Sequence, residues 1–189
     1  MNIIIFGPPG AGKGTQAKIV AEKYKLDHLS SGELSRQMLG DKILGSKIKK
    51  HLDKGELVPN KIIIDVVERY IKKNKKDKGF VFDGYPRNIG QARALNIFCK
   101  KENLTIDLII NLKLSEKESL KRILLRAKTS GRGDDNLKTS KNRLAIYRKR
   151  TAPVLDYYKK QKKLKVIEGK KSIELVAKEI DSLIKSINK

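Results

Sequence analysis

Cysteine, tryptophan and long apolar runs are what this 189-residue chain lacks. The single cysteine, Cys99, excludes an intrachain disulfide framework and a zinc site built from several cysteines. No apolar run approaches the roughly 18–20 residues that a membrane-spanning helix needs, so we expect no membrane segment. The first apolar stretch, Ile3 to Phe6, is too short for the hydrophobic part of a signal peptide. We therefore expect a protein of the reducing cytoplasm that binds no zinc.

Acidic residues are also scarce, because 21 Asp and Glu stand against 44 Lys and Arg, a formal net charge of +23. A balance this basic raises the question of a nucleic-acid partner. However, 34 of the 44 basic residues are lysines and only 5% of the chain is aromatic. Nucleic-acid readers usually combine arginine forks with aromatic side chains on which bases stack. We interpret most of the charge as a solvated surface and expect no specific nucleic acid; a polyanion-binding protein is the alternative from another functional class.

Short apolar runs alternate with segments of helical periodicity. Four runs with little polar alternation predict strands buried on both faces, and a fifth, weaker strand is expected at residues 26–29. The four runs are Ile3–Phe6, Phe80–Phe82, Leu108–Ile110 and Val166–Ile167. Helices are expected at residues 14–24, 62–71, 92–99, 144–158 and 172–187, with a kink or break near Pro153. This alternation predicts an α/β fold in which helices cover both faces of a parallel sheet.

Two segments interrupt the alternation and are predicted to be insertions. Residues 30–59 are helical without a strand of their own and open with Ser30-x-x-Glu33, a capping-box pattern. Residues 127–138 are polar and contain Gly131 and Gly133. The remaining segments, 1–29, 60–126 and 139–189, are expected to form one core.

The strongest functional signal is the run from Gly7 to Thr15, GPPGAGKGT, which matches the phosphate-binding pattern G-x-x-x-x-G-K. It lies between a predicted strand and a predicted helix, as the motif requires. Its glycines allow successive backbone N–H groups to surround a phosphate, and the helix start adds positive potential. Lys13 supplies a charge for the transferred group. Gly14 stands where Ser or Thr usually follows the lysine and Thr15 comes one residue late, so direct magnesium ligation by a hydroxyl is less secure than in the general motif.

Asp83 is the second signal, since it ends the predicted strand Phe80–Phe82 and opens the run Asp83-Gly84-Tyr85-Pro86-Arg87. Ligands of parallel sheets bind at the carboxyl ends of the strands. We expect Asp83 to hold Mg²⁺ through water.

Arginine usage is the third signal. Only ten residues are Arg in a chain whose usual base is Lys, so each Arg marks a place where a planar, permanently charged fork is useful. Six of them lie in or near the two insertions and the strand end, which together predicts a site for several phosphates: Arg36, Arg87, Arg122, Arg126, Arg132 and Arg143.

With these motifs in order, the chain resembles the adenylate kinases in their short-lid form over essentially its whole length. The matching segments are Gly7–Gln16, Leu29–Glu33, Asp83–Arg87 with Gln91, and Gly131–Asn136, followed by Arg143, Thr151–Pro153 and Tyr157–Tyr158. The resemblance implies a P-loop NTPase fold with strand order 2-3-1-4-5. Residues 30–59 would then be an AMP-binding insertion and residues 127–138 a short lid.

The resemblance also implies a reaction and a set of ligands. A monomeric, cytoplasmic enzyme would transfer a phosphoryl group reversibly from Mg-ATP to AMP and give two ADP. ATP would be held by Gly10, Ala11, Gly12, Lys13, Gly14, Thr15, Arg122, Arg126 and Lys171. AMP would be held by Ser31, Gly32, Arg36, Leu57, Val58, Gly84, Arg87, Gln91, Arg132 and Arg143. The catalytic set would be Lys13, Arg87, Arg122, Arg126, Arg132 and Arg143, with Asp134 and Asp135 orienting the lid arginines.

The close rival is a UMP/CMP kinase of the same fold. In family terms, Ser31 and Gln91 favour the adenylate enzymes, which tend to have Ser or Thr and Gln at these positions, whereas Asn88 after Arg87 favours the pyrimidine enzymes. His28 and His51 have no catalytic spacing with a nucleophile, so we expect structural or surface roles for both. An anionic acceptor phosphate needs no general base, which agrees with a site that lacks a histidine.

Overall fold

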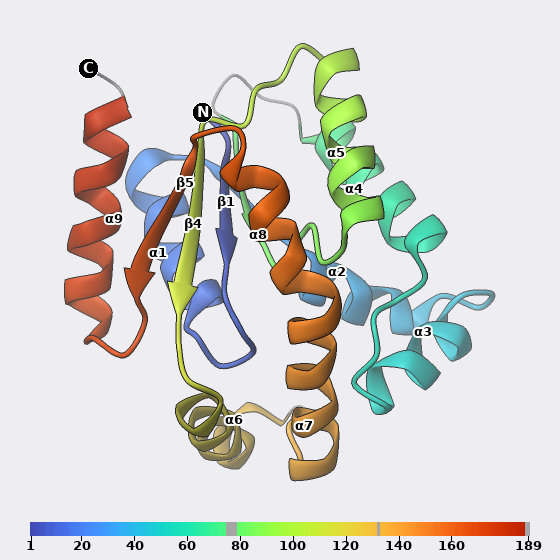
Figure 1. Cartoon of the computed structure of the whole chain (residues 1–189). Coiled ribbons are helices and arrows are strands. Elements are labelled where there is room, and N and C mark those ends of the chain that lie inside the picture. The colour runs from blue at the N-terminus through green and yellow to red at the C-terminus, as the bar shows by residue number, and fades with distance from the viewer. Residues whose placement is uncertain (75–78, 132, 188–189) are drawn as a thin grey trace.

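A five-stranded parallel sheet forms the centre of the molecule (Figure 1). This computed structural model describes residues 1–74, 79–131 and 133–187. The strands pair in the order β2-β3-β1-β4-β5, and the predicted α/β class and strand order are thereby confirmed. Their bounds are β1 (Ile3–Phe6), β2 (Asp27–Ser30), β3 (Phe80–Asp83), β4 (Leu108–Lys113) and β5 (Leu164–Glu168).

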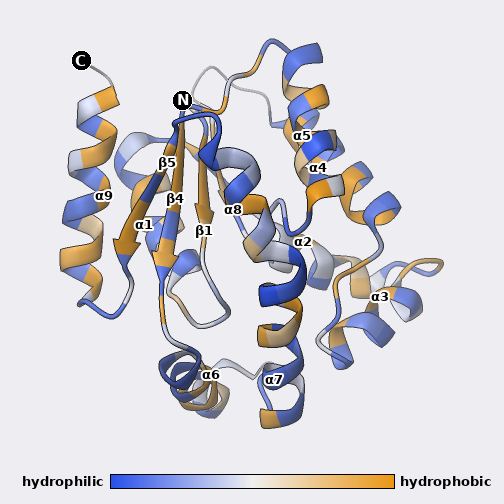
Figure 2. Cartoon of the chain, viewed as in Figure 1, coloured by the Kyte–Doolittle hydropathy of each residue, from blue (hydrophilic) through white to orange (hydrophobic). Residues whose placement is uncertain are grey.

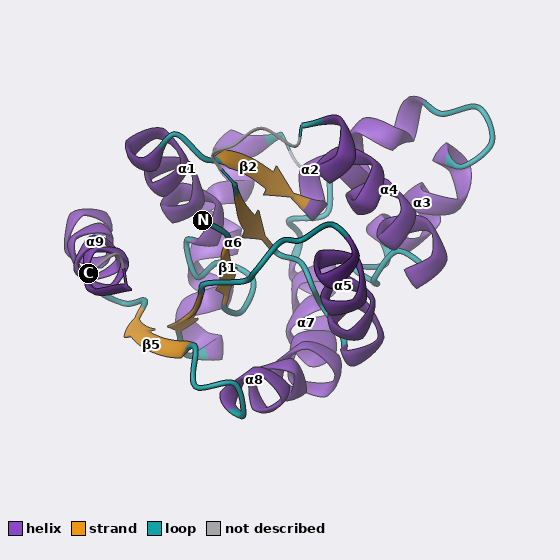
Figure 3. Ribbon diagram, turned by 90° about the horizontal axis from the view of Figure 1, so that it is seen from above, coloured by secondary structure: helices purple, strands orange, loops and turns teal. Residues whose placement is uncertain are grey.

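The alternation of side chains along β1 divides the core into two halves. Ile3 and Ile5 pack into one cluster with residues of α1 (Lys13–Tyr24) and α9 (Ile173–Ile187). Ile4 and Phe6 point to the opposite face and pack into a second cluster. The helices of that face are α4 (Asn60–Lys73), α5 (Ile89–Lys101) and α8 (Ala152–Lys159). The strands are accordingly the hydrophobic centre in Figure 2, and Figure 3 shows α1 and α9 on one side of the sheet and α5 and α8 on the other.

Strand β5 differs from the prediction that it is buried on both faces. Ile167 is buried, but the side chain of Val166 is 60% exposed and Lys165 is exposed. The reason is position, because β5 lies at the edge of the sheet, where only β4 pairs with it. An apolar run of two residues does not reveal whether a strand is central or at an edge.

The first predicted insertion consists of short helices. It contains α2 (Ser31–Gln37), the 3₁₀ turn η1 (Met38–Gly40) and α3 (Gly45–Asp53). Ser30 caps α2, since its hydroxyl accepts a hydrogen bond from the backbone N–H of Glu33 at 3.4 Å. The amino-terminal half of the expected capping box is therefore present.

The region around the second predicted insertion is more helical than its sequence indicated. Helix α6 (Glu116–Ser130), which the periodicity did not predict, continues into this insertion, and α7 (Leu137–Ile146) begins just before its end. A π-helical turn, η2 (Tyr147–Thr151), then joins α7 to α8. The predicted interruption near Pro153 is this widened turn, and the helical path continues through it.

Helix α7 contacts the end of α3 through two side chains. The hydroxyl of Thr139 donates to the carbonyl of Asp53 at 3.1 Å, and the amide of Asn142 donates to the carbonyl of Lys54 at 2.6 Å. Both carbonyls lie at the carboxyl end of α3, where backbone acceptors have no partner within the helix. Helix α7, most of which follows the second insertion, is thus hydrogen-bonded to the first insertion.

Within residues 1–74, 79–131 and 133–187, we find no helix that combines the length and apolar character needed to cross a bilayer.

Asn2 joins the starts of two strands and a loop, which generates a stability prediction. Its buried side chain accepts from the backbone N–H of Phe80 at 3.0 Å and donates to the carbonyl of Thr105 at 2.7 Å. Asn2→Ala should lower the free energy of unfolding by about 2 kcal/mol, because buried backbone groups lose their partners. Urea denaturation measures this loss. The exposed Lys121→Ala control should stay within about 0.5 kcal/mol of the parent chain, and an equal effect of both changes would contradict the assignment.

Candidate active site

The loop between β1 and α1 has the backbone geometry of an anion-binding nest. Gly10 and Gly12 have φ values of +82° and +85°, a region that side chains with a Cβ rarely adopt. A Cβ on Gly10 would lie only 2.8 Å from the carbonyl oxygen of Ser119. Helix α1 begins directly after Gly12, so its first N–H groups face the mouth of the loop.

Lys13 reaches back across this loop. Its Nζ donates to the carbonyl oxygens of Gly7 and Pro8 at 2.8 and 2.9 Å. Burial lowers the pKa of Lys13 to about 7; Asp83 opposes this shift and three neighbouring arginines add to it. The amine is therefore placed where an anionic ligand would restore its charge.

Asp83 lies at the carboxyl end of β3, beside the loop. A Cβ on Gly14 would lie 3.3 Å from its Oδ2, so the carboxylate is close to the start of α1. Burial by itself raises the pKa of Asp83, but the neighbouring His28, Lys13 and Arg87 outweigh burial and lower it. His28, on β2, places its Nε2 3.6 Å from Asp83 Oδ2. One ionised carboxylate of this kind fits a divalent cation held through water.

Asp135 is the second carboxylate of the site and has no exposed side-chain surface. Arg126 binds both of its oxygens at 2.7 Å, and Arg143 Nη1 donates to Oδ1 at 2.9 Å. The same nitrogen of Arg143 donates to the backbone carbonyl of Asp134 at 3.3 Å and forms an ion pair with Asp134 Oδ2 at 3.2 Å. Burial alone raises the pKa of Asp135, but the two guanidinium groups lower it. Asp135 therefore fixes two arginines from different helices at one point.

One cleft of about 560 Å³ brings most of these groups together. Its walls come from the loop, β3, the first insertion and the helices α6 and α7. The predicted site residues that line it are Gly10, Gly12, Lys13, Gly14, Thr15, Gly32, Arg36, Asp83, Arg87, Arg122, Arg126 and Arg143.

An adjoining cavity of about 430 Å³ lies between the loop and the start of α9. The predicted residues that line it are Gly10, Ala11, Gly12, Thr15, Arg122 and Lys171. Arg122 is fixed there by Glu118, by the carbonyl of Gly169 at 2.9 Å and by that of Lys170 at 3.4 Å. Lys171 instead pairs with Glu179 of α9.

The first insertion lines a third cavity. The predicted residues there are Ser31, Gly32, Arg36, Leu57, Val58, Arg87, Gln91 and Arg143. A Cβ on Gly32 would lie 3.4 Å from Arg36 and 3.6 Å from Arg87, so both guanidinium groups lie against this glycine. Gly84 is adjacent, because its carbonyl accepts from Ser31 Oγ at 2.5 Å and from Arg87 Nε at 2.6 Å.

Arg132 lies outside the described residues, so its predicted role has no structural counterpart. Sequence reasoning missed the contacts of Asn60 with Gln91 and of Thr151 with Arg87, which the structure shows at 3.0 and 2.8 Å. It also assigned His28 no place beside Asp83. His51 pairs with Glu56 on the first insertion, 2.9 Å away. No local motif marks Asn60, and Thr151 enters the sequence argument only as part of the segment Thr151–Pro153, with no partner predicted for it.

Comparison with known proteins decides the family. The model of the adenylate kinase family matches residues 5–163. The adenylate kinase of Parabacteroides distasonis is 40% identical over 188 residues, which cover 99% of both chains. That of Azobacteroides pseudotrichonymphae is 42% identical over 181 residues, 95% of each chain, and that of Archaeoglobus fulgidus is 38% identical over 215 aligned positions, 99% of each. The chain belongs to the adenylate kinase family.

As a member of this family, the chain is a nucleoside monophosphate kinase, which is a phosphotransferase. Neither the UMP/CMP kinase nor the polyanion-binding alternative is favoured by these matches.

The pKa of Lys13 generates a prediction about proton uptake. Anionic phosphates raise the pKa of a neighbouring amine, so binding a non-hydrolysable ATP analogue at pH 8 should take up about one proton. The contribution of Lys13 to affinity should be complete below pH 7 and should be lost as the pH rises through the pKa of the complex. Calorimetry in buffers of different ionisation enthalpy measures the uptake. Lys13→Met should abolish it, and buffer-independent heats for the parent chain would contradict the prediction.

Asp135 generates a second prediction, with Asp134 as its matched control. Asp135→Asn removes the charge that both Arg126 and Arg143 bind, and it should lower the free energy of unfolding by about 3 kcal/mol. Asp134→Asn affects a more exposed carboxylate, which pairs with one guanidinium group among the residues that the structure describes, and should cost less than about 1 kcal/mol. Denaturant titration compares the two variants. Equal losses would show that Asp135 does not hold the two arginines.

Proposed function

We propose that this chain transfers a phosphoryl group reversibly from Mg-ATP to AMP and gives two ADP. The proposal is carried by the single cleft that Lys13 and the pair Arg36 and Arg87 line together. A donor held at the loop and an acceptor held at this arginine pair would place their phosphates in the same space. Residues 30–59 act in this proposal as the AMP-binding insertion and residues 127–138 as the lid.

The donor is held by the loop residues Gly10 to Thr15 through their backbone N–H groups and Lys13. Arg122 and Lys171 border the cavity for its base, and Arg126 reaches its phosphates. Asp83 would hold Mg²⁺ through water, and the bound ion supplies charge neutralisation on the donor phosphates.

The acceptor is held from the other side of the cleft. Arg36 and Arg87 grip its phosphate beside Gly32, which leaves room because it has no side chain. Ser31, Leu57, Val58, Gly84 and Gln91 surround the nucleoside. Arg143, together with Arg132, bridges both phosphate groups around the one that is transferred.

The chemistry needs position and positive charge more than proton transfer. The acceptor oxygen is already anionic, so no general base has to remove a proton from it. Charge spreads over the equatorial oxygens of the transferred group as the reaction proceeds, and Lys13 and the arginines stabilise that charge. Asp135 keeps Arg126 and Arg143 in place before the substrates arrive, which reduces the reorganisation that the reaction requires.

A coupled assay with Mg-ATP as donor tests the proposal. AMP should support ADP formation far better than CMP, UMP or GMP. We also expect the chain to act as a monomer. Lys13→Ala should lower kcat by about a hundredfold or more while the fold survives, because fixed charge at the transferred group is lost. A preference for CMP or UMP would instead identify a pyrimidine kinase. Near-normal turnover in a folded Lys13→Ala variant would contradict the role of Lys13.

A further inference from the structure

The side-chain amide of Gln91 is held at both ends by other parts of the chain. Gln91 lies on α5 and is 2% exposed. Its Oε1 accepts from the backbone N–H of Arg87 at 2.7 Å, and its Nε2 donates to Oδ1 of Asn60 at 3.0 Å. Asn60 is the first residue of α4, 31 positions earlier in the chain.

Two backbone N–H groups fix the orientation of every amide in this cluster. The N–H of Arg87 can only donate, so the end of Gln91 that faces it must be the oxygen. The backbone N–H of Gln91 likewise fixes Oδ1 of Asn88, at 3.0 Å. The Nδ2 of Asn88 is therefore turned to Asn60 Oδ1, at 2.8 Å, so this one oxygen receives both Asn88 and Gln91. Turning any of the three amides around would set like groups against each other.

The two bonds leave Gln91 with one free lone pair on Oε1 and one free N–H on Nε2. Gln91 lines the same cavity as Ser31 and Val58, whereas Asn60 does not line it. A ligand in this cavity that bonded to the Gln91 amide would therefore meet an acceptor and a donor in a fixed order. Adenine offers an amino donor beside the ring acceptor N1, whereas a 6-oxo purine offers an acceptor beside an N1–H donor, the reverse order.

We propose that Asn60 is a positioning residue: it holds the Nε2 end of the Gln91 amide, whose oxygen end the Arg87 N–H fixes, and so favours a 6-amino purine acceptor over a 6-oxo purine. Asn60 acts only through Gln91 and touches no substrate. This inference rests on the proposed function, because it takes the cavity with Gln91 to be the acceptor site.

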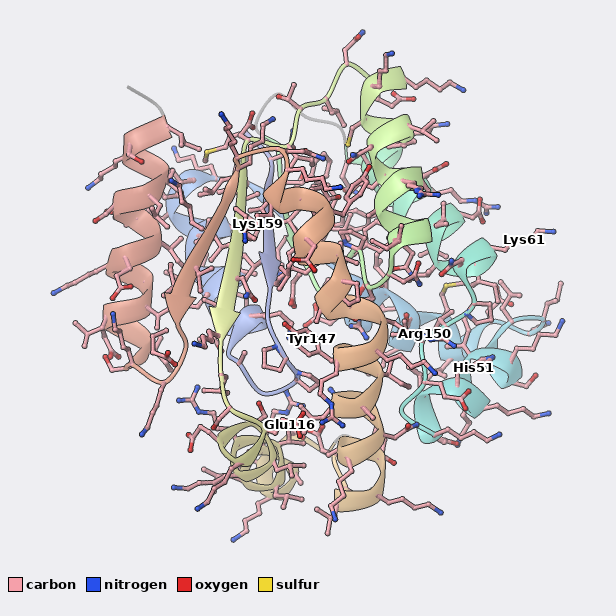
Figure 4. All side chains as sticks on the ribbon, in the orientation of Figure 1. His51, Lys61, Glu116, Tyr147, Arg150 and Lys159 are labelled. Atoms are coloured by element: carbon pink, nitrogen blue, oxygen red, sulfur yellow. The ribbon has the colours of Figure 1, made fainter. Side chains whose placement is uncertain are left out.

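The surface position of Asn60 makes the inference testable without loss of the fold. Asn60 is exposed, so replacing it creates no buried cavity. Asn60→Ala removes the oxygen that accepts from Gln91. Asn60→Asp keeps an oxygen that can accept from both Gln91 and Asn88, but its second oxygen replaces the Nδ2 that donates to Asn88 Oδ1 at 3.4 Å. Lys61→Ala is the matched control, since Lys61 is the next residue of α4 and its side chain points away from the molecule (Figure 4).

The experiment compares AMP with IMP as acceptor, with Mg-ATP as donor, in the full chain. Asn60→Ala should lower kcat/KM for AMP about three- to tenfold, mainly through the KM for AMP, with a smaller change for IMP. The ratio of the two acceptors should fall by a similar factor, and the KM for ATP should not change. Asn60→Asp should recover most of the ratio, because it loses only the long bond from Nδ2 to Asn88. Lys61→Ala should leave the ratio at the parent value.

Parallel losses for AMP and IMP in Asn60→Ala would overturn the inference, as would a ratio in Asn60→Asp no higher than in Asn60→Ala. If Asn60→Ala does not fold, Asn60→Ser carries the same test, because its hydroxyl is too short to replace the amide. A parent chain without AMP-dependent ADP formation would instead refute the proposed function itself, so the two failures are distinguishable.

Discussion

Burial lowers the pKa of both Lys13 and Arg87, and repulsion from Arg143 lowers each further. Holding so many cations around one cleft is the constraint on which the rest of the structure depends. Without phosphate, the carboxylates of Asp83, Asp134 and Asp135 oppose the repulsion. Asp83 lies between the loop and β2, and Asp135 lies between α6 and α7. The carboxyl ends of the strands, the first insertion and the helices α6 and α7 are placed so that these charges face one another.

This arrangement also explains why the fold keeps its charged groups on separate elements. Lys13 follows the loop, Asp83 ends β3, and α6 and α7 carry Arg126 and Arg143. A phosphate group that enters the cleft replaces repulsion with attraction at several elements at once. Phosphate binding therefore links several separate elements of the fold, whereas it would order only one segment if all the cations lay together on that segment.

The sequence predicts the centre of the fold well, because continuous apolar runs such as Ile3–Phe6 belong to central strands. It fails at the periphery, where burial is partial. Val166 lies in an edge strand, and α6 buries only Ser119 and Ile123 while Leu125 stays exposed, so its apolar periodicity is weak. The pattern Ser115-x-x-Glu118 at the start of α6 is the signal that was available, since Ser115 caps this helix.

The residues of the site also divide into those that the sequence predicts and those that it does not. The loop around Lys13 is contiguous, so its motif carries both the geometry and the chemistry. The grouping of Arg36, Arg87, Arg126 and Arg143 follows from scarcity of arginine and from resemblance. Partnerships between distant residues are different, because they exist only once the chain is folded. Asn60 is one polar residue among many until α4 and α5 lie side by side and Asn88 and Gln91 come within hydrogen-bond distance of it.

The contact between α7 and the end of α3 has a thermodynamic consequence. Thr139 and Asn142 hold the carbonyls of Asp53 and Lys54 from the helix that also carries Arg143. A ligand that shifts the equilibrium position of α3 therefore acts on α7 as well. Linkage is reciprocal. If a ligand at the first insertion changes the affinity of the loop for its ligand through this contact, the ligand at the loop changes the affinity of the first insertion by the same factor.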